Sequence, residues 1–212
     1  MNIRNLSNVF GKITNFSKNI KNIRNIRNIS TFKEKIDNSI NIRNKSNVEA
    51  EILNYNDVQE LIKELKSPEE GEEYFLLNQF KYRILPGVDD TSKLKANFLL
   101  DIIEDRSHSP IIDKVDAVNI LGTMQGGYSI EVLVKLLETN YAKFAAEQLK
   151  KNIFLFDYFY SIQDLYLKNN EFAKDILKSW ANAEWFTSRD KLPEKITLTC
   201  FKVNGEINTD DL

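Results

Sequence analysis

The feature that most constrains the fold is a series of short amphipathic segments, each bounded by residues that begin or end helices. In the first segment, Asn56 or Asp57 can cap a helix whose apolar residues recur at the helical period. Ser67 and Pro68 end this helix, because the residue before a proline avoids the helical conformation. The apolar face consists of Val58, Leu61, Ile62 and Leu65.

Residues that begin or end helices continue to separate amphipathic segments along the chain. Ser67 with Glu70 three residues later predicts a capping box for the second helix, and Asp89 or Asp90 opens a third helix after the Pro86–Gly87 turn. Further helices are expected near 113–121, 130–138 with Ser129 as cap, 141–155, 158–168 and 171–186. Short helices with short connections predict an all-α helical-repeat layer. Its expected core includes Leu61, Phe75, Phe98, Leu121, Leu133, Phe154 and Trp180.

The spacing of apolar residues changes from the helical period to alternation after Pro193. Residues 195–203 alternate between apolar and polar side chains and are rich in β-branched residues, which predicts a β-strand followed by a turn at Asn204–Gly205. The hairpin partner of this strand is missing from the sequence. Cys200 would share a strand face with Ile196 and Leu198, so we expect it to be a buried thiol.

Residues 1–48 form a basic arm that differs from the rest of the chain. They hold ten Lys or Arg against Glu34 and Asp37, a net charge of 10 − 2 = +8, so the remainder carries 19 − 29 = −10. Isoleucine recurs every third residue from Ile20 to Ile29, next to basic residues. This pattern is typical of a mitochondrial transit peptide. A disordered Asn-rich tail is the alternative, and nucleic-acid binding is disfavoured because aromatic residues are not interleaved regularly.

Other features limit the class of protein. No apolar run approaches the roughly 18 residues of a membrane span. The single cysteine, Cys200, excludes an internal disulfide framework and cannot by itself hold zinc or an iron–sulfur cluster. His108 is the only histidine and has no second ligand or nucleophile nearby in sequence, so we expect a loop residue.

Five ordered segments resemble the N-terminal part of the aconitase B family, aconitate hydratase 2. They are Gly71–Leu77, Pro86–Asp90, Leu121–Tyr128, Ser179–Phe186 and Phe201–Leu212. The resemblance implies a HEAT-like helical domain (an α-α superhelix) over residues 49–190. Residues 191–212 would be the start of the swivel domain, truncated as it begins. The family isomerises citrate and isocitrate through cis-aconitate, with a four-iron four-sulfur cluster held by three cysteines.

The resemblance also assigns roles to particular residues. Asp210 matches a family position that helps to organise an active-site histidine, whereas the cluster and its cysteines would lie outside this region. We therefore expect no catalytic, cofactor-binding or metal-binding residue that works in this chain alone. Trp180, Trp185 and Phe186 are expected to anchor a domain interface. A structural role is expected for the motif Gly122, Thr123, Met124, Gln125, Gly126, Gly127 and Tyr128, whose spacing fits no phosphate loop.

The resulting functional hypothesis is an accessory, protein-interacting module of an aconitate hydratase, without activity alone. Its partner would be another protein chain, either a catalytic chain of that enzyme or a second copy. One alternative is a chain of a split enzyme that is active only with a cluster-bearing partner, and another is a degenerate gene remnant. The arm suggests the mitochondrial matrix, with the cytoplasm as the alternative.

Overall fold

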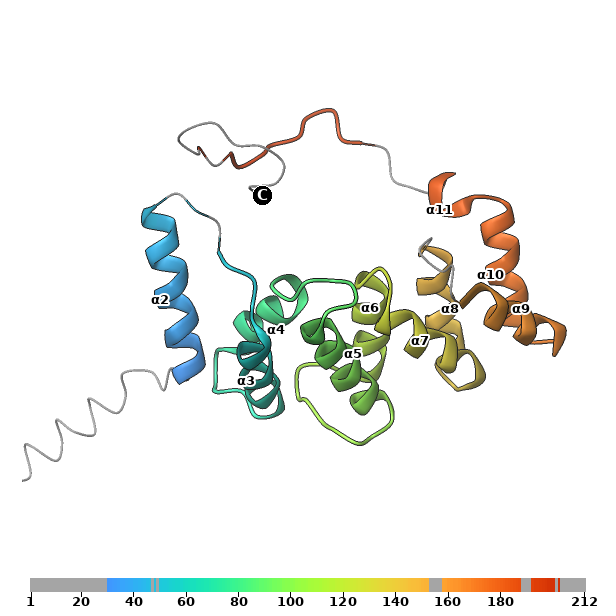
Figure 1. Cartoon of the computed structure of the whole chain (residues 1–212), viewed down its shortest axis with the longest axis horizontal. Helices are drawn as coiled ribbons and strands as arrows, with labels where there is room; N and C mark the ends of the chain where they lie inside the picture. The colour runs from blue at the N-terminus through green and yellow to red at the C-terminus, as the bar shows by residue number, and fades with distance from the viewer. Residues whose placement is uncertain are drawn as a thin grey trace, which may run out of the picture.

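The computed structural model describes residues 30–46, 48, 50–152, 158–187, 192–200 and 202, and within them the chain is all-α (Figure 1). The helices are α2 (Thr31–Lys45), α3 (Tyr55–Lys66), α4 (Glu73–Tyr82), α5 (Asp90–Ile103), α6 (Lys114–Thr123), α7 (Tyr128–Lys135) with the short 3-10 turn η1 (Leu136–Glu138), α8 (Ala142–Lys150), α9 (Phe159–Leu167), α10 (Glu171–Ala181) and α11 (Glu184–Thr187). None of these helices is long and apolar enough to cross a bilayer.

The helices are arranged in chain order, with α2 at one end of the array and α11 at the other (Figure 1). The main packing contacts join helices that are adjacent or next-but-one in sequence, such as α5 with α6 and α6 with α8. This near-neighbour pattern is the property that defines helical-repeat proteins. The all-α helical-repeat fold expected from the sequence is therefore confirmed.

One continuous core runs through the array. Leu61, Phe98, Leu121 and Leu133 are buried in it, as expected, and the predicted residues Phe75 and Trp180 are half-buried against it. The predicted core residue Phe154 lies outside the described residues. The Phe80 and Phe98 rings meet edge to face at 5.8 Å, which joins α4 to α5.

Several helix boundaries differ from the sequence prediction. Helix α3 begins two or three residues earlier than predicted, because the Asn54 side chain accepts from the Asp57 N–H and the Asp57 side chain accepts from the Asn54 N–H. The predicted Ser67–Glu70 capping box is wrong: Ser67 ends α3, and α4 begins only after Glu72. Gly71 lies between them with φ of +87°, which a right-handed helix cannot contain.

Among the later helix boundaries, some agree with the sequence prediction and others do not. Asp89 and Asp113 cap α5 and α6 through their side chains; Asp89 is one of the two caps predicted for α5, and α6 begins close to the predicted residue 113. Ser129 does not cap α7; Gly127 precedes that helix, and the Ser129 hydroxyl donates to the Gly126 carbonyl at 2.9 Å. The single helix predicted at 171–186 is two helices, broken where Ala183 has φ of +52°.

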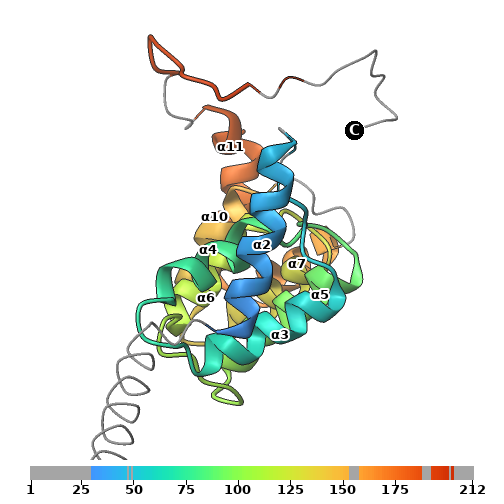
Figure 2. The same ribbon diagram turned by 90° about the vertical axis from the view of Figure 1, so that its left-hand side faces the viewer.

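Helix α2 corrects the picture of a uniform basic arm over residues 1–48. Phe32 and Ile36 are buried in the common core, although both belong to the segment predicted to be an arm. The Ser30 N–H and hydroxyl donate to the two carboxylate oxygens of Glu72, at 2.9 and 2.6 Å. Figure 2 views the array from this end, with α2 in front of α3 and α4. Residues 1–29 of the predicted arm lie outside the described residues.

The strand predicted at 195–203 is wrong where the structure describes it. Residues 192–200 have no regular secondary structure, and the Ile196, Leu198 and Cys200 side chains are exposed. This segment runs above the helices, back toward the α2 end, and no strand pairs with it in the described part of the chain (Figure 1). An alternating pattern forms a strand only when a second strand satisfies its backbone groups. Residues 201 and 203–212 are outside the description.

Candidate functional site

Two of the sequence motifs, Pro86–Asp90 and Leu121–Tyr128, meet in the structure. Gly127 has φ of +53°, and a Cβ atom at this position would lie 2.7 Å from both the Gly87 carbonyl oxygen and the Val88 Cγ1. The Gly87 carbonyl is also held by the Ser92 hydroxyl, which donates to it at 3.0 Å. Glycine at 127 therefore permits both the backbone conformation and the close approach of the two loops.

The rest of the second motif turns the chain between α6 and α7. Gln125 has φ of +55° and Gly126 has φ of +138°, so the chain leaves the right-handed conformation directly after the buried C-cap residue Met124. The Thr123 hydroxyl donates to the Ile120 carbonyl at 2.7 Å. Tyr128 opens α7, and the Lys93 ammonium lies 5.5 Å from its ring centroid, a cation–π contact to α5.

Gly122 has a separate role as a contact point within α6. A Cβ atom on it would lie 2.3 Å from Oε1 of Gln148 on α8. The Gln148 Nε2 atom in turn donates to the Asn119 Oδ1 atom at 2.8 Å. The motif thus places α6 against α8, and the turn between α6 and α7 against the 86–90 loop.

A pocket of about 440 Å³ opens beside this junction, between the end of α4, helix α5 and helix α6. We call it the Lys95 pocket. Its floor is formed by buried side chains: Ile84, Lys95, Ile120 and Met124. Its rim is formed by more exposed residues: Lys81, Tyr82, Pro86, Asp116, Asn119 and Thr123.

Lys95 is the unusual residue of this pocket, because only 2% of it is exposed. Its ammonium donates to the Lys81 carbonyl at 3.1 Å and lies 5.3 Å from the Phe80 ring centroid. Burial, reinforced by the positive charge of Lys81, lowers the pKa of Lys95 to about 8. Lys95 was not predicted as a site residue from the sequence; it lies three residues before Phe98 on the apolar stripe of α5, but that position alone does not reveal burial.

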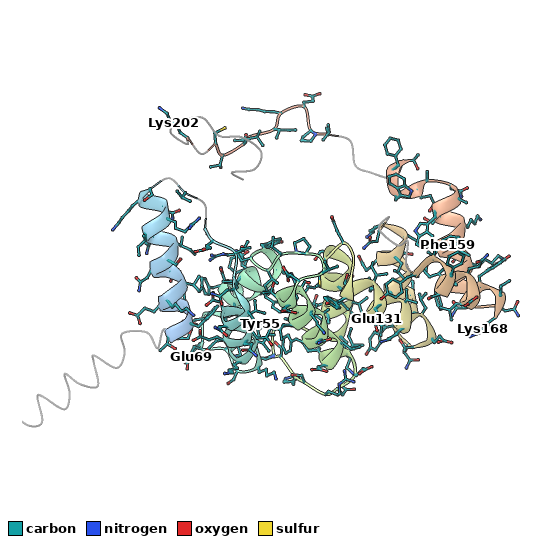
Figure 3. The ribbon with its side chains drawn as sticks, in the orientation of Figure 1. Tyr55, Glu69, Glu131, Phe159, Lys168 and Lys202 are labelled. Atoms are coloured by element: carbon teal, nitrogen blue, oxygen red, sulfur yellow. The ribbon has the colours of Figure 1, made fainter. Side chains whose placement is uncertain are left out.

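The aromatic residues predicted to anchor an interface lie together at the far end of the array. The Trp180 Nε1–H donates to the Leu149 carbonyl at 3.1 Å, and the indole stacks on Phe159 with ring centroids 6.4 Å apart. Trp185 contacts Phe186 edge to face at 5.8 Å. We call Phe159, Tyr160, Trp180, Trp185 and Phe186 the aromatic surface; it spans α9, α10 and α11, and Figure 3 labels Phe159 on it. Tyr160 and Phe186 are each about two-thirds exposed or more, at 71% and 67%.

The described residues contain no group of three or more His, Cys, Asp or Glu side chains arranged to hold a metal ion. His108 is exposed in the loop between α5 and α6, as predicted. Asp210, the position matched to a family active-site residue, lies outside the described residues. The sites that the structure does assemble are therefore the Lys95 pocket and the aromatic surface.

An all-α array whose helices contact mainly their near neighbours in the sequence belongs to the class of helical-repeat proteins. The family model for the aconitate B N-terminal domain matches residues 35–186, so the chain belongs to this family. Aconitate hydratase B of Pseudomonas aeruginosa is 48% identical over 161 residues, which cover 76% of this chain and 18% of that protein. Its counterpart in Escherichia coli K12 is 44% identical over 161 residues, or 76% of this chain and 19% of that protein.

A more distant relative, aconitate hydratase B of Synechocystis, is 41% identical over 163 residues, again 76% of this chain and 19% of that protein. The chain thus spans about a fifth of the length of the curated relatives that it matches. The match begins at residue 35, within α2, so the similarity extends into the segment that sequence reasoning assigned to the arm.

Proposed function

We propose that this chain is the helical accessory domain of a B-type aconitate hydratase and that it acts by binding the catalytic domains of that enzyme. The observation that carries the proposal is the aromatic surface, in which the exposed rings of Phe159, Tyr160 and Phe186 adjoin the half-buried rings of Trp180 and Trp185 at one end of the array. Contiguous exposed apolar residues on a folded protein mark interaction sites. Tryptophan and tyrosine are also enriched among the residues that dominate binding energy at interfaces.

The chemistry of such an enzyme would be the interconversion of citrate and isocitrate at a four-iron four-sulfur cluster. The single cysteine of this chain can supply one thiolate, whereas that cluster type needs several. In this proposal the chain positions the catalytic domains and contributes no reacting group from its described residues. The purified chain, incubated anaerobically with iron and sulfide, is expected to stay colourless and inactive.

The test combines the full 212-residue chain with a Pseudomonas aeruginosa aconitate hydratase B from which the matching N-terminal region has been removed. Binding is measured by calorimetry, and activity by the ultraviolet absorbance of cis-aconitate. We expect a complex that the Phe186→Ala and Trp185→Ala variants weaken at least tenfold, as for residues at an interface centre. The matched control is Tyr74→Ala, since Tyr74 is an aromatic residue on α4 that is 82% exposed, more than Phe186, and lies outside the aromatic surface.

The possible outcomes separate the alternatives. A complex with recovered turnover supports the split-enzyme version, in which the two chains work together. A complex without turnover supports the accessory role alone. The absence of binding, or equal weakening by the Tyr74 and Phe186 variants, would contradict the proposal.

We also propose that residues 1–29 direct the protein to the mitochondrial matrix. This segment contains six Lys or Arg and no Asp or Glu. Such a composition is typical of transit peptides, which are basic and poor in acidic residues. The proposed targeting segment ends before Ser30, because Ser30 and α2 pack on the helical array.

A further inference from the structure

The Lys95 pocket has the shape of a ligand site. Its volume of about 440 Å³ lies within the range of roughly 300–1,000 Å³ that is usual for small-molecule sites. The floor is mostly apolar, and a single charged nitrogen is placed among its side chains. Small-molecule sites commonly combine an apolar lining with a few placed polar groups, which is the arrangement found here.

Part of the role of Lys95 is structural. Its ammonium donates to the Lys81 carbonyl, one of the last carbonyls of α4, which the helix itself leaves unpaired. A cation at a helix C-terminus is also favoured by the helix dipole. This contact uses one of the three N–H groups of the ammonium, and the Phe80 ring faces it at 5.3 Å. Capping α4 therefore leaves donor capacity that the fold does not use.

The charges around the pocket favour one kind of ligand. Lys95 forms no salt bridge among the described residues, and the charge that acts on it is the like charge of Lys81. With Lys81 and Lys95 against Asp116, the ionisable lining sums to 2 − 1 = +1. A single carboxylate balances this charge, whereas phosphate would bring a second charge close to Asp116. The described lining also lacks the arginine fork that commonly holds phosphate.

We propose that the Lys95 pocket binds a small monocarboxylate, with the carboxylate on the Lys95 ammonium and a short apolar body on Ile84, Ile120 and Met124. The Thr123 and Tyr82 hydroxyls lie on the rim, where they can take up a polar substituent of the ligand. This binding site goes beyond the accessory role proposed above and does not depend on it. Because the pocket joins α4, α5 and α6, a bound ligand also stabilises the folded array by mass action.

The test titrates the full chain with butyrate and hexanoate, followed by two-dimensional NMR and by the melting temperature. We expect binding in the millimolar range, which suits ligands of about eight non-hydrogen atoms. The neutral controls are butanol and hexanol, and inorganic phosphate is the control for a general anion site. We expect hexanoate to bind about 10- to 100-fold more tightly than hexanol, as for a hydrogen bond to a charged group.

Two variants locate the site. Lys95→Met keeps the length of the side chain without its charge and is expected to lower hexanoate affinity about 10- to 100-fold. Lys93→Met is the matched control, since Lys93 is exposed on the same helix and outside the pocket. Thr123→Phe fills the opening from an exposed position without touching the buried lysine, and is expected to abolish binding.

Each remaining outcome counts against the proposal. It is overturned if hexanol or phosphate binds as tightly as hexanoate. It is also overturned if neither carboxylate binds at about 20 mM, a concentration well above the dissociation constant expected for a ligand of this size. Hexanoate binding that survives both Lys95→Met and Thr123→Phe also overturns it. Loss of binding in the Lys93→Met control would place the ligand elsewhere and contradict the assignment to this pocket.

Discussion

Replacing Gly127 by alanine tests whether the contact between the two loop motifs holds the array together. The alanine would keep a φ near +53°, where non-glycine residues are strained by about 1–3 kcal/mol. Its Cβ would start 2.7 Å from the Gly87 carbonyl oxygen and the Val88 Cγ1. Because backbone forms one side of this contact, the 86–88 loop must move, and such overpacking costs about 1–3 kcal/mol. The two ranges sum to about 2–6 kcal/mol, and because the mostly exposed 86–88 loop can relax we expect a loss near the lower end, about 3 kcal/mol.

Other glycines of this chain supply the controls. Gly71 and Gly126 also have positive φ, +87° and +138°, but a Cβ on either would meet nothing within 4 Å. Alanine at these two positions therefore reports backbone strain alone. Gly122→Ala meets only the Gln148 side chain, which can swing away, so the improved helix propensity of about 1 kcal/mol offsets the lost Asn119 hydrogen bond.

The assay is equilibrium unfolding in urea, followed by far-ultraviolet circular dichroism. With a slope of about 2.5 kcal/mol per molar urea, within the usual range, the Gly127→Ala midpoint falls by about 1 M. Gly71→Ala and Gly126→Ala are expected to fall by about half as much. The reasoning is refuted if Gly127→Ala is no less stable than the Gly71 and Gly126 variants, since the contact with the 86–88 loop would then contribute nothing.

Three further predictions follow from the same structure. Burial depresses the pKa of Lys95 from 10.5 to about 8, so the unfolded chain binds more protons between these values. Relative to Lys95→Met, wild-type stability should therefore rise by about 3 kcal/mol from pH 8 to 10.5, and a flat difference in urea unfolding would contradict this. Ser30→Ala removes one bond to Glu72 and the cap of α2, so it should destabilise the chain by about 1–2 kcal/mol and speed proteolysis within α2, unlike Ser46→Ala. Residues 1–29 fused to a fluorescent protein should direct it to mitochondria; the reporter should stay cytosolic with glutamine at Arg4, Lys12, Lys18, Lys21, Arg24 and Arg27. A wild-type segment that leaves the reporter in the cytosol would favour the disordered-tail reading.

Structural features that depend on residues close together in the sequence could be predicted. Those that depend on contacts between residues far apart in the sequence could not. Asp89 and Asp113 cap their helices through residues three positions away, so both starts were readable. Helix α2 was hidden because its buried residues, Phe32 and Ile36, stand in an Asn- and Ile-rich segment and contact distant helices. The alternating pattern of residues 195–203 led to a wrong strand prediction, because a strand requires a partner strand that a local pattern cannot supply.

The Lys95 pocket lay beyond sequence reasoning for a related reason. A lysine on an apolar stripe usually extends its charge to solvent, so its position alone does not reveal burial. Lys95 is buried because the end of α4 packs against it. The carbonyl of Lys81, fourteen residues earlier in the chain, accepts a hydrogen bond from its ammonium there. The motif glycines were recognised, but their partners, the Gly87 carbonyl and the Gln148 side chain, became known only from the packing.

The bonds from Ser30 to Glu72 have a consequence for synthesis of the chain. The residue that fixes the start of α2 lies 42 positions downstream of it. At about 5–20 residues per second, a ribosome needs roughly 2–8 seconds to add that stretch. During this interval α2 lacks its anchor, so residues 31–45 follow the basic sequence of residues 1–29 without the packing that fixes them in the finished fold. A receptor or processing protease that meets the nascent chain therefore encounters a longer accessible stretch than the finished fold presents.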